Sequence, residues 1–281
     1  MLHINTIITG LLLTTTAFGA GHSLFTWSDI NTREVIRWDG DIAVIQHGAA
    51  MEEFSCRVNI DDSSVEFAIN SFGIPKSWTS FSYHDEIELK EKQKHLSENA
   101  AKHGIKMHPE GNKFSVDYKW VIDQSKESIQ DIAKAIKNSA RKKGYRTKRE
   151  LVGAFASFVQ SLKYRIPSNY RINKEGETIL TAGAMVPLET LSNKWGDCDS
   201  KCMLFASLVR SIDLVDVVFI IMKEHIFAAV QVTTQQDEHT VRYKNKDWAL
   251  VELTDAWPIG RVPSNHLNGV LVGKFEIVNI K

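Results

Sequence analysis

The fold is organised around one stretch, Trp195-Gly196-Asp197-Cys198-Asp199-Ser200-Lys201-Cys202. Apolar residues continue at helical spacing through 203–212, which predicts a buried helix. Cys198, in the first turn of that helix, would face unpaired backbone N–H groups and the positive end of the helix dipole, and both favour a thiolate. Asp197 and Asp199 are candidate caps of the helix. Cys198 is therefore a candidate nucleophile at a fixed, partly exposed position.

A nucleophilic cysteine needs a base that takes its proton and a third group that orients the base. Downstream apolar runs predict three strands, at 216–222, 226–232 and 248–254, with 233–246 as a hairpin connection. His225 stands directly before the second strand. Glu252 interrupts the third, where a carboxylate needs a partner. We expect a catalytic group of Cys198, His225 and Glu252, with Asp255 as the alternative acid.

Three short motifs around these residues resemble the transglutaminase-like superfamily, in particular its bacterial cysteine peptidases. In chain order they are Gly196-Asp197-Cys198-Asp199-Ser200, Glu224-His225-Ile226-Phe227-Ala228 and Trp248-Ala249-Leu250-Val251-Glu252-Leu253-Thr254. The family order of Cys, His and acid is kept, and the match covers roughly the second half of the chain. Many relatives have Asp followed by Pro at the third position, where this chain has Glu252-Leu253. The acid thus stays open between Glu252 and Asp255.

The resemblance implies an α+β fold with a papain-like core, in which the Cys198 helix packs on an antiparallel sheet that carries His225 and the acid. It implies an enzyme, a thiol hydrolase (peptidase or amidase) that cleaves peptide or amide bonds through a thioester, with no cofactor and no metal. Two alternatives share this fold: a protein-glutamine acyltransferase with the same triad, and a non-catalytic binding module. The expected partner is a protein or peptide substrate in the cell envelope.

The reaction also needs hydrogen-bond donors for the oxyanion. The backbone N–H of Cys198 is one candidate because it lies at the helix start. Candidates for the second donor are Gln160, Asn193 and Trp195. Trp195 and Trp257 are candidate walls of a cleft or buried structural residues. Asp199 would raise the pKa of the neighbouring thiol, so we expect it to point away or to pair with Lys201.

Composition describes a globular chain of 281 residues in which 34 Lys and Arg balance 34 Asp and Glu. This balance gives no reason to expect a nucleic-acid partner. Residues 1–21 carry an apolar core followed by small residues, which predicts a signal peptide, although no Lys or Arg precedes the core. The core is too short for a comfortable transmembrane helix. We therefore expect a bacterial periplasmic or secreted protein without stable membrane insertion after signal cleavage.

The chain has three cysteines, an odd number for an exported protein. The simplest arrangement leaves Cys198 free for chemistry and buries Cys202 in the core, one helical turn later. A disulfide between Cys56 and Cys202 is an alternative. A zinc site of Cys198, Cys202 and either His225 or another histidine is a competing chemistry, which the lack of a second close cysteine pair disfavours.

The pattern of apolar residues divides the chain into a β-rich N-terminal region, residues 22–120, and the catalytic domain, residues 121–281. Short apolar or alternating runs predict strands at 34–38, 42–45, 56–60 and 65–69, and a charged helix follows over 85–103 with Gly104 as its stop. The second region begins with helices, because apolar residues recur at helical spacing and Thr147 with Glu150 forms a capping box. Histidines other than His225 are expected to be structural or exposed, among them His266.

Overall fold

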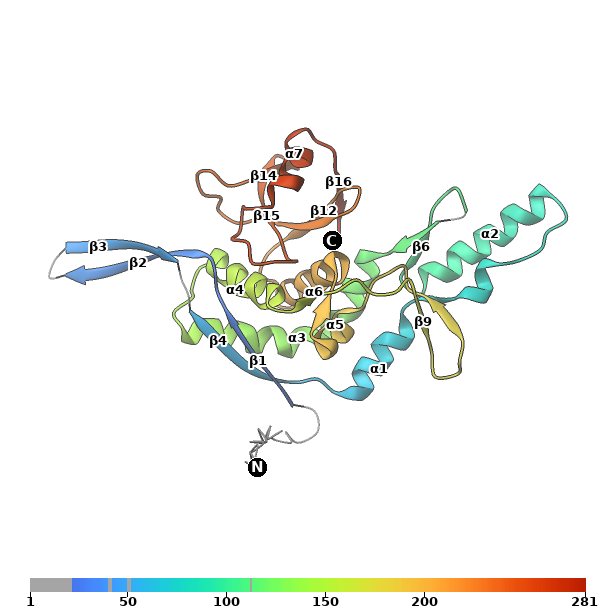
Figure 1. The fold of residues 1–281 in the computed structure, drawn as a ribbon, viewed down its shortest axis with the longest axis horizontal. Coiled ribbons are helices and arrows are strands. Elements are labelled where there is room, and N and C mark those ends of the chain that lie inside the picture. Colours follow the sequence, from blue (N-terminus) through green and yellow to red (C-terminus); the bar gives the residue numbers. More distant parts are fainter. Residues whose placement is uncertain (1–21, 40–41, 50–51, 112) are drawn as a thin grey trace, which may run out of the picture.

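The computed structural model describes residues 22–281 apart from 40–41, 50–51 and 112, and the side chains of residues 23–281 apart from 32–51 and 112. The predicted signal peptide, residues 1–21, lies outside the described residues. The described chain is mixed α+β, with seven α-helices and several small antiparallel sheets (Figure 1). The α+β class predicted from the sequence is confirmed.

Two antiparallel pairs of strands open the N-terminal region. Strand β1 (His22–Ser28) pairs with β4 (Glu53–Asn59), which sets Phe25 opposite Cys56. Exposed and buried residues alternate along β4, as expected for a strand with one face on the core. Strands β2 (Thr32–Asp39) and β3 (Ile42–Ala49) form a hairpin that projects from the body of the molecule (Figure 1).

The strand predicted over 65–69 is wrong, because these residues lie in helix α1 (Asp62–Ser71). Asp61 caps this helix by accepting a hydrogen bond from the backbone N–H of Ser64 at 2.9 Å. Val65, Ala68 and Phe72 recur at helical spacing and contact the core. The polar residues 61–64, which look like a turn, are therefore a helix start.

The charged helix is confirmed as α2 (Glu86–Ala101), and Gly104 follows it with a positive φ of 72°. Four short elements surround it: β5 (Ile74–Pro75), the 3₁₀ helix η1 (Lys76–Thr79), β6 (Ile105–Met107) and β7 (Phe114–Val116). The N-terminal region thus holds helices as well as strands.

Four helices form the centre of the molecule: α3 (Tyr118–Lys142), α4 (Lys148–Gln160), α5 (Pro187–Asn193) and α6 (Cys198–Ser211). The capping box predicted from Thr147 and Glu150 is confirmed at the start of α4. Helix α6 packs against α3, α4 and α5. Short strands link these helices: β8 (Lys163–Tyr164), β9 (Tyr170–Ile172), β10 (Thr178–Leu180) and β11 (Trp195–Gly196).

A five-stranded antiparallel sheet lies over the helices in the order β14-β15-β13-β12-β16 (Figure 1). Its strands are β12 (Val217–Ile221), β13 (Ile226–Val230), β14 (Thr240–Tyr243), β15 (Lys246–Val251) and β16 (Glu276–Asn279), and helix α7 (Ser264–Leu271) precedes the last one. The three predicted strands are confirmed. Two details differ: the expected connection contains β14, and Glu252 follows β15 directly instead of lying within it.

Both faces of this sheet are covered, which explains the continuous apolar runs of its central strands. The cross-strand row Phe219, Ala228 and Val251 belongs to the core shared with α6. The next row belongs to a second cluster on the other face, with Val262 and Val270 of the α7 segment; its strand residues are Val218, Ala229 and Leu250. The sheet is therefore sandwiched between α6 and α7.

The N-terminal strands share the core of the helices. Trp27 donates its indole N–H to the backbone carbonyl of Ala154 at 3.1 Å. Buried Asp29 accepts hydrogen bonds from the hydroxyls of Tyr145 at 2.7 Å and Ser157 at 3.0 Å. The predicted boundary between residues 120 and 121 falls inside α3, so the division into two domains stays a prediction.

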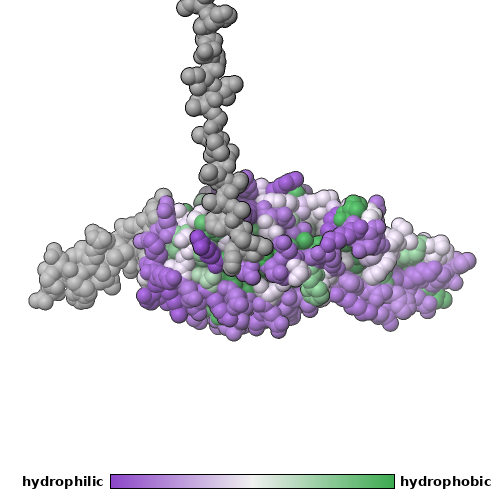
Figure 2. Space-filling view, turned by 90° about the horizontal axis from the view of Figure 1, so that it is seen from below, coloured by the Kyte–Doolittle hydropathy of each residue, from purple (hydrophilic) through white to green (hydrophobic). Residues whose placement is uncertain are grey.

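The outside of the molecule is mainly polar on the face seen in Figure 2, where apolar residues lie in small separate groups. Within the described ranges, no helix combines the length and apolar character needed to cross a membrane.

Candidate active site

The start of α6 holds Cys198 in a fixed place. Asp197 precedes the helix in extended conformation and caps it, since its carboxylate accepts from the backbone N–H of Ser200 at 3.0 Å and from the Ser200 hydroxyl at 2.6 Å. A Cβ on Gly196 would come within 3.1 Å of Thr190 Cγ2 and 3.0 Å of Ser200 Cβ, so a larger residue would crowd this turn. Cys198 is the first residue of α6 and is 9 % exposed.

His225 and Glu252 form a hydrogen-bonded pair beside this helix. The distance from His225 Nε2 to Glu252 Oε2 is 2.8 Å, and the glutamate side chain is fully buried. The other carboxylate oxygen accepts from the backbone N–H and the hydroxyl of Thr254, at 2.7 and 2.6 Å. Burial alone would raise the pKa of Glu252, but the hydrogen bonds from His225 and Thr254 outweigh it and hold that pKa below its usual value. Glu252 is thus an anion that fixes the imidazole.

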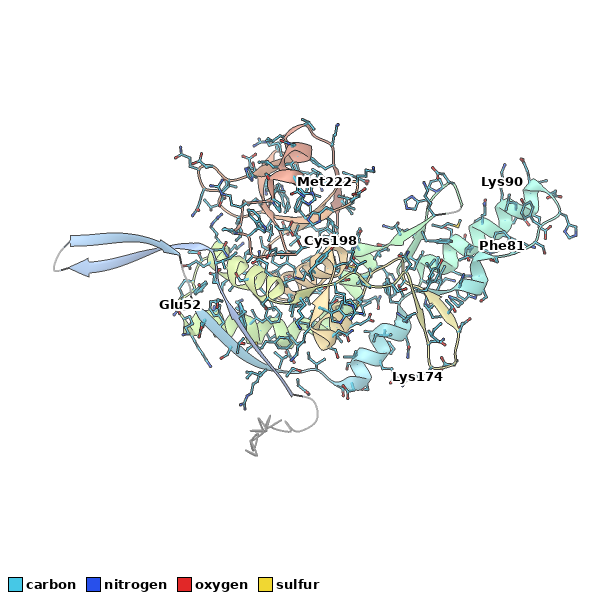
Figure 3. All side chains as sticks on the ribbon, viewed as in Figure 1. Glu52, Phe81, Lys90, Lys174, Cys198 and Met222 are labelled. Atoms are coloured by element: carbon cyan, nitrogen blue, oxygen red, sulfur yellow. The ribbon has the colours of Figure 1, made fainter. Side chains whose placement is uncertain are left out.

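Ile226, the residue after His225, connects this pair to the cysteine helix. Its backbone N–H is hydrogen-bonded to the Cys198 sulfur, and its carbonyl accepts from the Cys202 thiol at 3.6 Å. Figure 3 shows Cys198 where the helices meet the C-terminal sheet. Because Nε2 of His225 donates to Glu252, Nδ1 is the ring nitrogen that keeps a free lone pair. The structure pairs His225 with Glu252 and sets the backbone of the next residue, Ile226, at the Cys198 sulfur.

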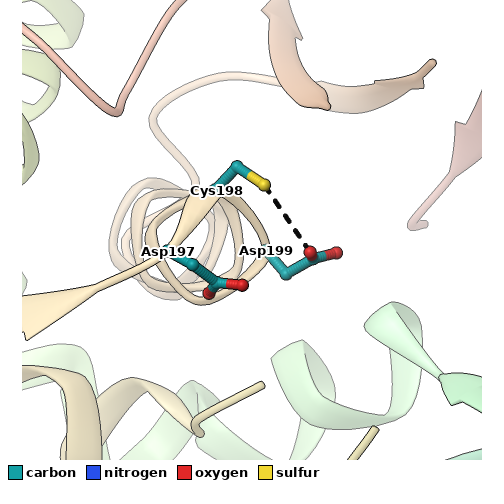
Figure 4. Close-up of side chains that lie close together, drawn as sticks. All are labelled: Asp197, Cys198 and Asp199. Carbon is teal, nitrogen blue, oxygen red and sulfur yellow. Dashed lines mark hydrogen bonds between the residues drawn. The ribbon is translucent and has the colours of Figure 1, made fainter. Parts of the chain in front are cut away.

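Asp199 contacts the thiol, which differs from the expectation that it points away or pairs with Lys201. The Cys198 sulfur lies 3.7 Å from Asp199 Oδ2 (Figure 4), and the other carboxylate oxygen accepts from the Tyr118 hydroxyl of α3. Burial, with the charges of Asp199 and Asp197, raises the pKa of Cys198 to about 12. The expectation of a helix-favoured thiolate is therefore wrong for this resting state, in which Cys198 is a thiol.

Lys201 lies beneath the site, fully buried. Its ammonium donates to the carbonyls of Leu162 at 2.6 Å and Thr254 at 3.4 Å. Burial lowers the pKa of Lys201 to about 8, although the charges of Glu252 and Asp255 oppose this shift. Lys201 thus ties α6 to the segment that follows the acid.

Asp255, the alternative acid, is exposed, and its carboxylate accepts from the backbone N–H of Ala256 at 2.7 Å. Glu252 is the acid that contacts His225 in this structure. The distinction is tertiary, since both carboxylates follow β15 within four residues.

The three candidates for the second oxyanion donor occupy different positions. The Gln160 amide donates to the carbonyls of Glu252 at 2.8 Å and Trp257 at 2.7 Å, so both of its hydrogens hold the acid-bearing segment. Asn193 is exposed at the end of α5, and its amide lies 3.8 Å from the Met185 sulfur. Trp195 is half-buried two residues before the cap Asp197. Trp195 and the backbone N–H of Cys198 stay the predicted donors nearest the thiol in sequence.

The three cysteines of the described chain are all free. The Cys202 thiol points to Ile226 in the core, as expected, and the alternative disulfide with Cys56 is not formed. Among the residues that the structure describes, the potential metal-ligand atoms that lie together are those of Asp197, Cys198 and Asp199, within 4.8 Å of one another. Cys202 and His225 are not in that group, so the competing zinc arrangement is not the one observed.

Two residues of the site have no signal in the sequence. Tyr118 reaches Asp199 from a helix that begins 80 residues earlier in the chain. His266 of α7 stacks on His225, with ring centroids 4.4 Å apart and an angle of 13° between the planes. His266 is one of the histidines that the sequence predicts to be structural or exposed. Neither contact could be found from spacing, because each depends on how a distant helix packs.

Comparisons of the chain with protein-family models, curated proteins and solved structures find no match. The transglutaminase-like resemblance thus stays a prediction from the three motifs.

Proposed function

We propose that this protein is an exported cysteine hydrolase that cleaves peptide or amide bonds, with Cys198 as nucleophile, His225 as base and Glu252 as the orienting acid. The observation that carries this proposal is the buried pair of His225 and Glu252, 2.8 Å apart. The residue after the histidine, Ile226, donates a backbone hydrogen bond to the Cys198 sulfur. A helix that bears the cysteine and packs on a sheet that bears the other two residues fits a papain-like, transglutaminase-like core.

In the proposed reaction, Nδ1 of His225 takes the proton of Cys198 as the sulfur attacks the substrate carbonyl carbon. The carbonyl π electrons move to oxygen, and the backbone N–H of Cys198 is placed at a helix start to donate to that oxyanion. The imidazolium gives its proton to the leaving amine as the C–N bond breaks, which leaves a thioester. Water attacks this thioester with His225 again as base, and the acid product and the thiol are released.

The resting thiol makes the base essential to this proposal. A Cys198 pKa of about 12 leaves almost no thiolate at neutral pH, so reactivity depends on proton transfer to His225 during attack. Glu252 contributes by stabilising the imidazolium that forms, as its lowered pKa keeps it charged. The substrate class proposed is a protein or peptide of the cell envelope, which depends on export by the predicted signal peptide.

Alkylation of Cys198 by iodoacetamide tests the catalytic group. We expect the wild-type thiol to react at least about tenfold faster at pH 7 than in His225→Ala, with Glu252→Gln in between. Peptide mass spectrometry separates Cys198 from the buried Cys56 and Cys202. His84→Ala is the matched control, because the side chain of His84 is 94 % exposed. Equal rates in wild type and His225→Ala would sink the enzyme proposal and favour a binding module.

Partition of a trapped acyl-enzyme distinguishes hydrolase from acyltransferase. We expect an acyl group loaded on Cys198 from an activated ester to leave mainly as free acid when a primary amine is added. Mass spectrometry of the product gives the ratio. Dominant formation of the amide would instead identify the protein-glutamine acyltransferase.

A further inference from the structure

His225 is enclosed on several sides besides its contact with Glu252. The ring of Phe227 meets it edge-on, with centroids 4.6 Å apart and planes at 74°. The ring of His266 lies flat on one of its faces, 4.4 Å away at 13°. The His225 side chain is consequently only 10 % exposed. The imidazole plane is therefore held by a hydrogen bond at Nε2, an edge contact and a stacked ring.

The position of His266 follows from the sheet. Phe227 belongs to the cluster on the α7 face, and His225, two residues earlier, lies on the same side by strand alternation. Helix α7 packs on this face through Val270, and the segment that leads to it starts at Glu252. Gln160 anchors that segment by bonding the carbonyls of Glu252 and Trp257. One anchored segment thus delivers both the acid and the stacked ring to His225.

We propose that His266 is a positioning residue for the base, whose stacked neutral ring keeps Nδ1 of His225 directed at Cys198. This inference rests on the proposed function, because it assigns His266 a role toward the catalytic histidine. A ring face is also a favourable surface for a cation, so the stack stabilises the charged form of His225 during attack.

The groups that face His266 support a neutral ring. Asn265 Nδ2 lies 3.3 Å from His266 Nε2, where an amide N–H donates to an imidazole lone pair. Burial, and then repulsion from His225, lower the pKa of His266, while the charge of Glu252 opposes these effects. Phe227, whose ring also contacts His266, carries no charge. His266 therefore takes up a proton only at acid pH, and its charge then repels a protonated His225.

Two substitutions separate the ring from its proton. His266→Phe keeps an aromatic ring against His225 but removes the group that takes up a proton, so we expect the rate of Cys198 alkylation at pH 7 to stay within about threefold of wild type. In His266→Ala the face is lost, and we expect a rate roughly tenfold lower. Leu271→Ala, an exposed residue of the same helix, is the control for disturbance of α7. Circular dichroism and thermal melting check that each variant is folded.

NMR titration of the His225 ring gives a readout that does not depend on reactivity. In wild type we expect a second inflection at acid pH from protonation of His266, and it should vanish in both His266 variants. Unchanged titration and alkylation in His266→Ala would overturn the proposal, as would an equal loss of reactivity in His266→Phe. Failure of the proposed function would give a different result. Alkylation of Cys198 would then be insensitive to His225→Ala, while the coupled titration of the His225 and His266 rings would persist.

Discussion

The groups around Cys198 control the protonation of its sulfur. Asp199 Oδ2 is 3.7 Å from the sulfur. The backbone N–H of Ile226, the residue after His225, donates a hydrogen bond to the same sulfur. Tyr118 takes the other oxygen of Asp199, and burial together with the Asp199 charge raises the pKa of that tyrosine. Burial and the charge of Asp199 thus keep the resting thiol protonated, and the proposed base is the residue before Ile226.

Removal of the Asp199 charge should lower the pKa of Cys198. Asp199→Asn keeps an oxygen acceptor for Tyr118 but removes the negative charge that disfavours the thiolate. In the His225→Ala background, where the base does not contribute, we expect about tenfold faster alkylation at pH 7. The pH dependence of the iodoacetamide rate from pH 6 to 10 measures the shift.

Asp131→Asn is the control for this prediction, since Asp131 has a side chain 94 % exposed on α3. A rate profile of Asp199→Asn that superimposes on that of its parent would show that Asp199 does not set the protonation of the thiol.

At the scale of single elements, two helices start with the same cap in different surroundings. Asp61 caps α1 and Asp197 caps α6, and each carboxylate accepts from the backbone N–H and hydroxyl of a serine three residues later. Asp61 is exposed, and hydrogen bonds from Ser63 and Ser64 lower its pKa. Asp197 is buried, and burial raises its pKa to about 6. Burial, helped by the charge of Asp199, reverses the direction of the pKa shift.

Stability near neutral pH should therefore respond to Asp197. Its folded pKa lies above the unfolded value of 3.8, so its contribution is full below about pH 4 and is lost as pH rises through about 6. We expect Asp197→Asn to gain roughly 2–3 kcal/mol of unfolding free energy relative to wild type between pH 4 and pH 8. Urea denaturation at both pH values measures the difference.

Asp61→Asn is the matched control. Because hydrogen bonds lower the folded pKa of Asp61, its contribution to stability is complete above the unfolded value of 3.8 and is lost as pH falls through the folded pKa. Its difference from wild type should not change between pH 5 and pH 8. The same pH response in both variants would contradict the burial argument.

Local patterns predicted the elements better than their surroundings. The helix α3 face of Ile129, Ile132 and Ile136 is buried, and the capping box of α4 is formed. The strand predicted over residues 65–69 is wrong because an alternating pattern over five residues also fits about one and a half turns of helix. The cap formed by Asp61 favours the helix. The periodicity of a sequence predicts the local element and its buried face, but it does not identify the distant helix that packs against that face.

At the scale of the whole molecule, the N-terminal strands and the central helices share one core. Trp27 stacks on Phe54 at 5.2 Å and meets Phe158 of α4 edge-on at 5.1 Å. Its indole also donates to the Ala154 carbonyl. This contact predicts that regions 22–120 and 121–281 unfold together.

Two native thiols can test that prediction. Cys56 on β4 and Cys202 on α6 are both buried, one in each region. We expect both to become accessible to a thiol reagent at the same urea concentration, and Trp27→Ala to lower that concentration for both, with a loss of about 3–5 kcal/mol. Mass spectrometry locates the label.

Leu24→Ala on the same strand is the control, because Leu24 is 45 % exposed. Labelling of Cys56 at a much lower urea concentration than Cys202 would show that the N-terminal region unfolds independently, as the division into two domains predicts.

The sequence by itself determined what depends on neighbours along the chain: the α+β class, most helices and the central strands, and the motifs around Cys198, His225 and Glu252. The tertiary structure alone decided that Glu252 and not Asp255 reaches His225, that Asp199 faces the thiol and Tyr118, and that His266 stacks on the base. These contacts join residues on separate elements, and the shift of the Cys198 pKa depends on burial. Both arise only when the elements pack, so no local pattern encodes them.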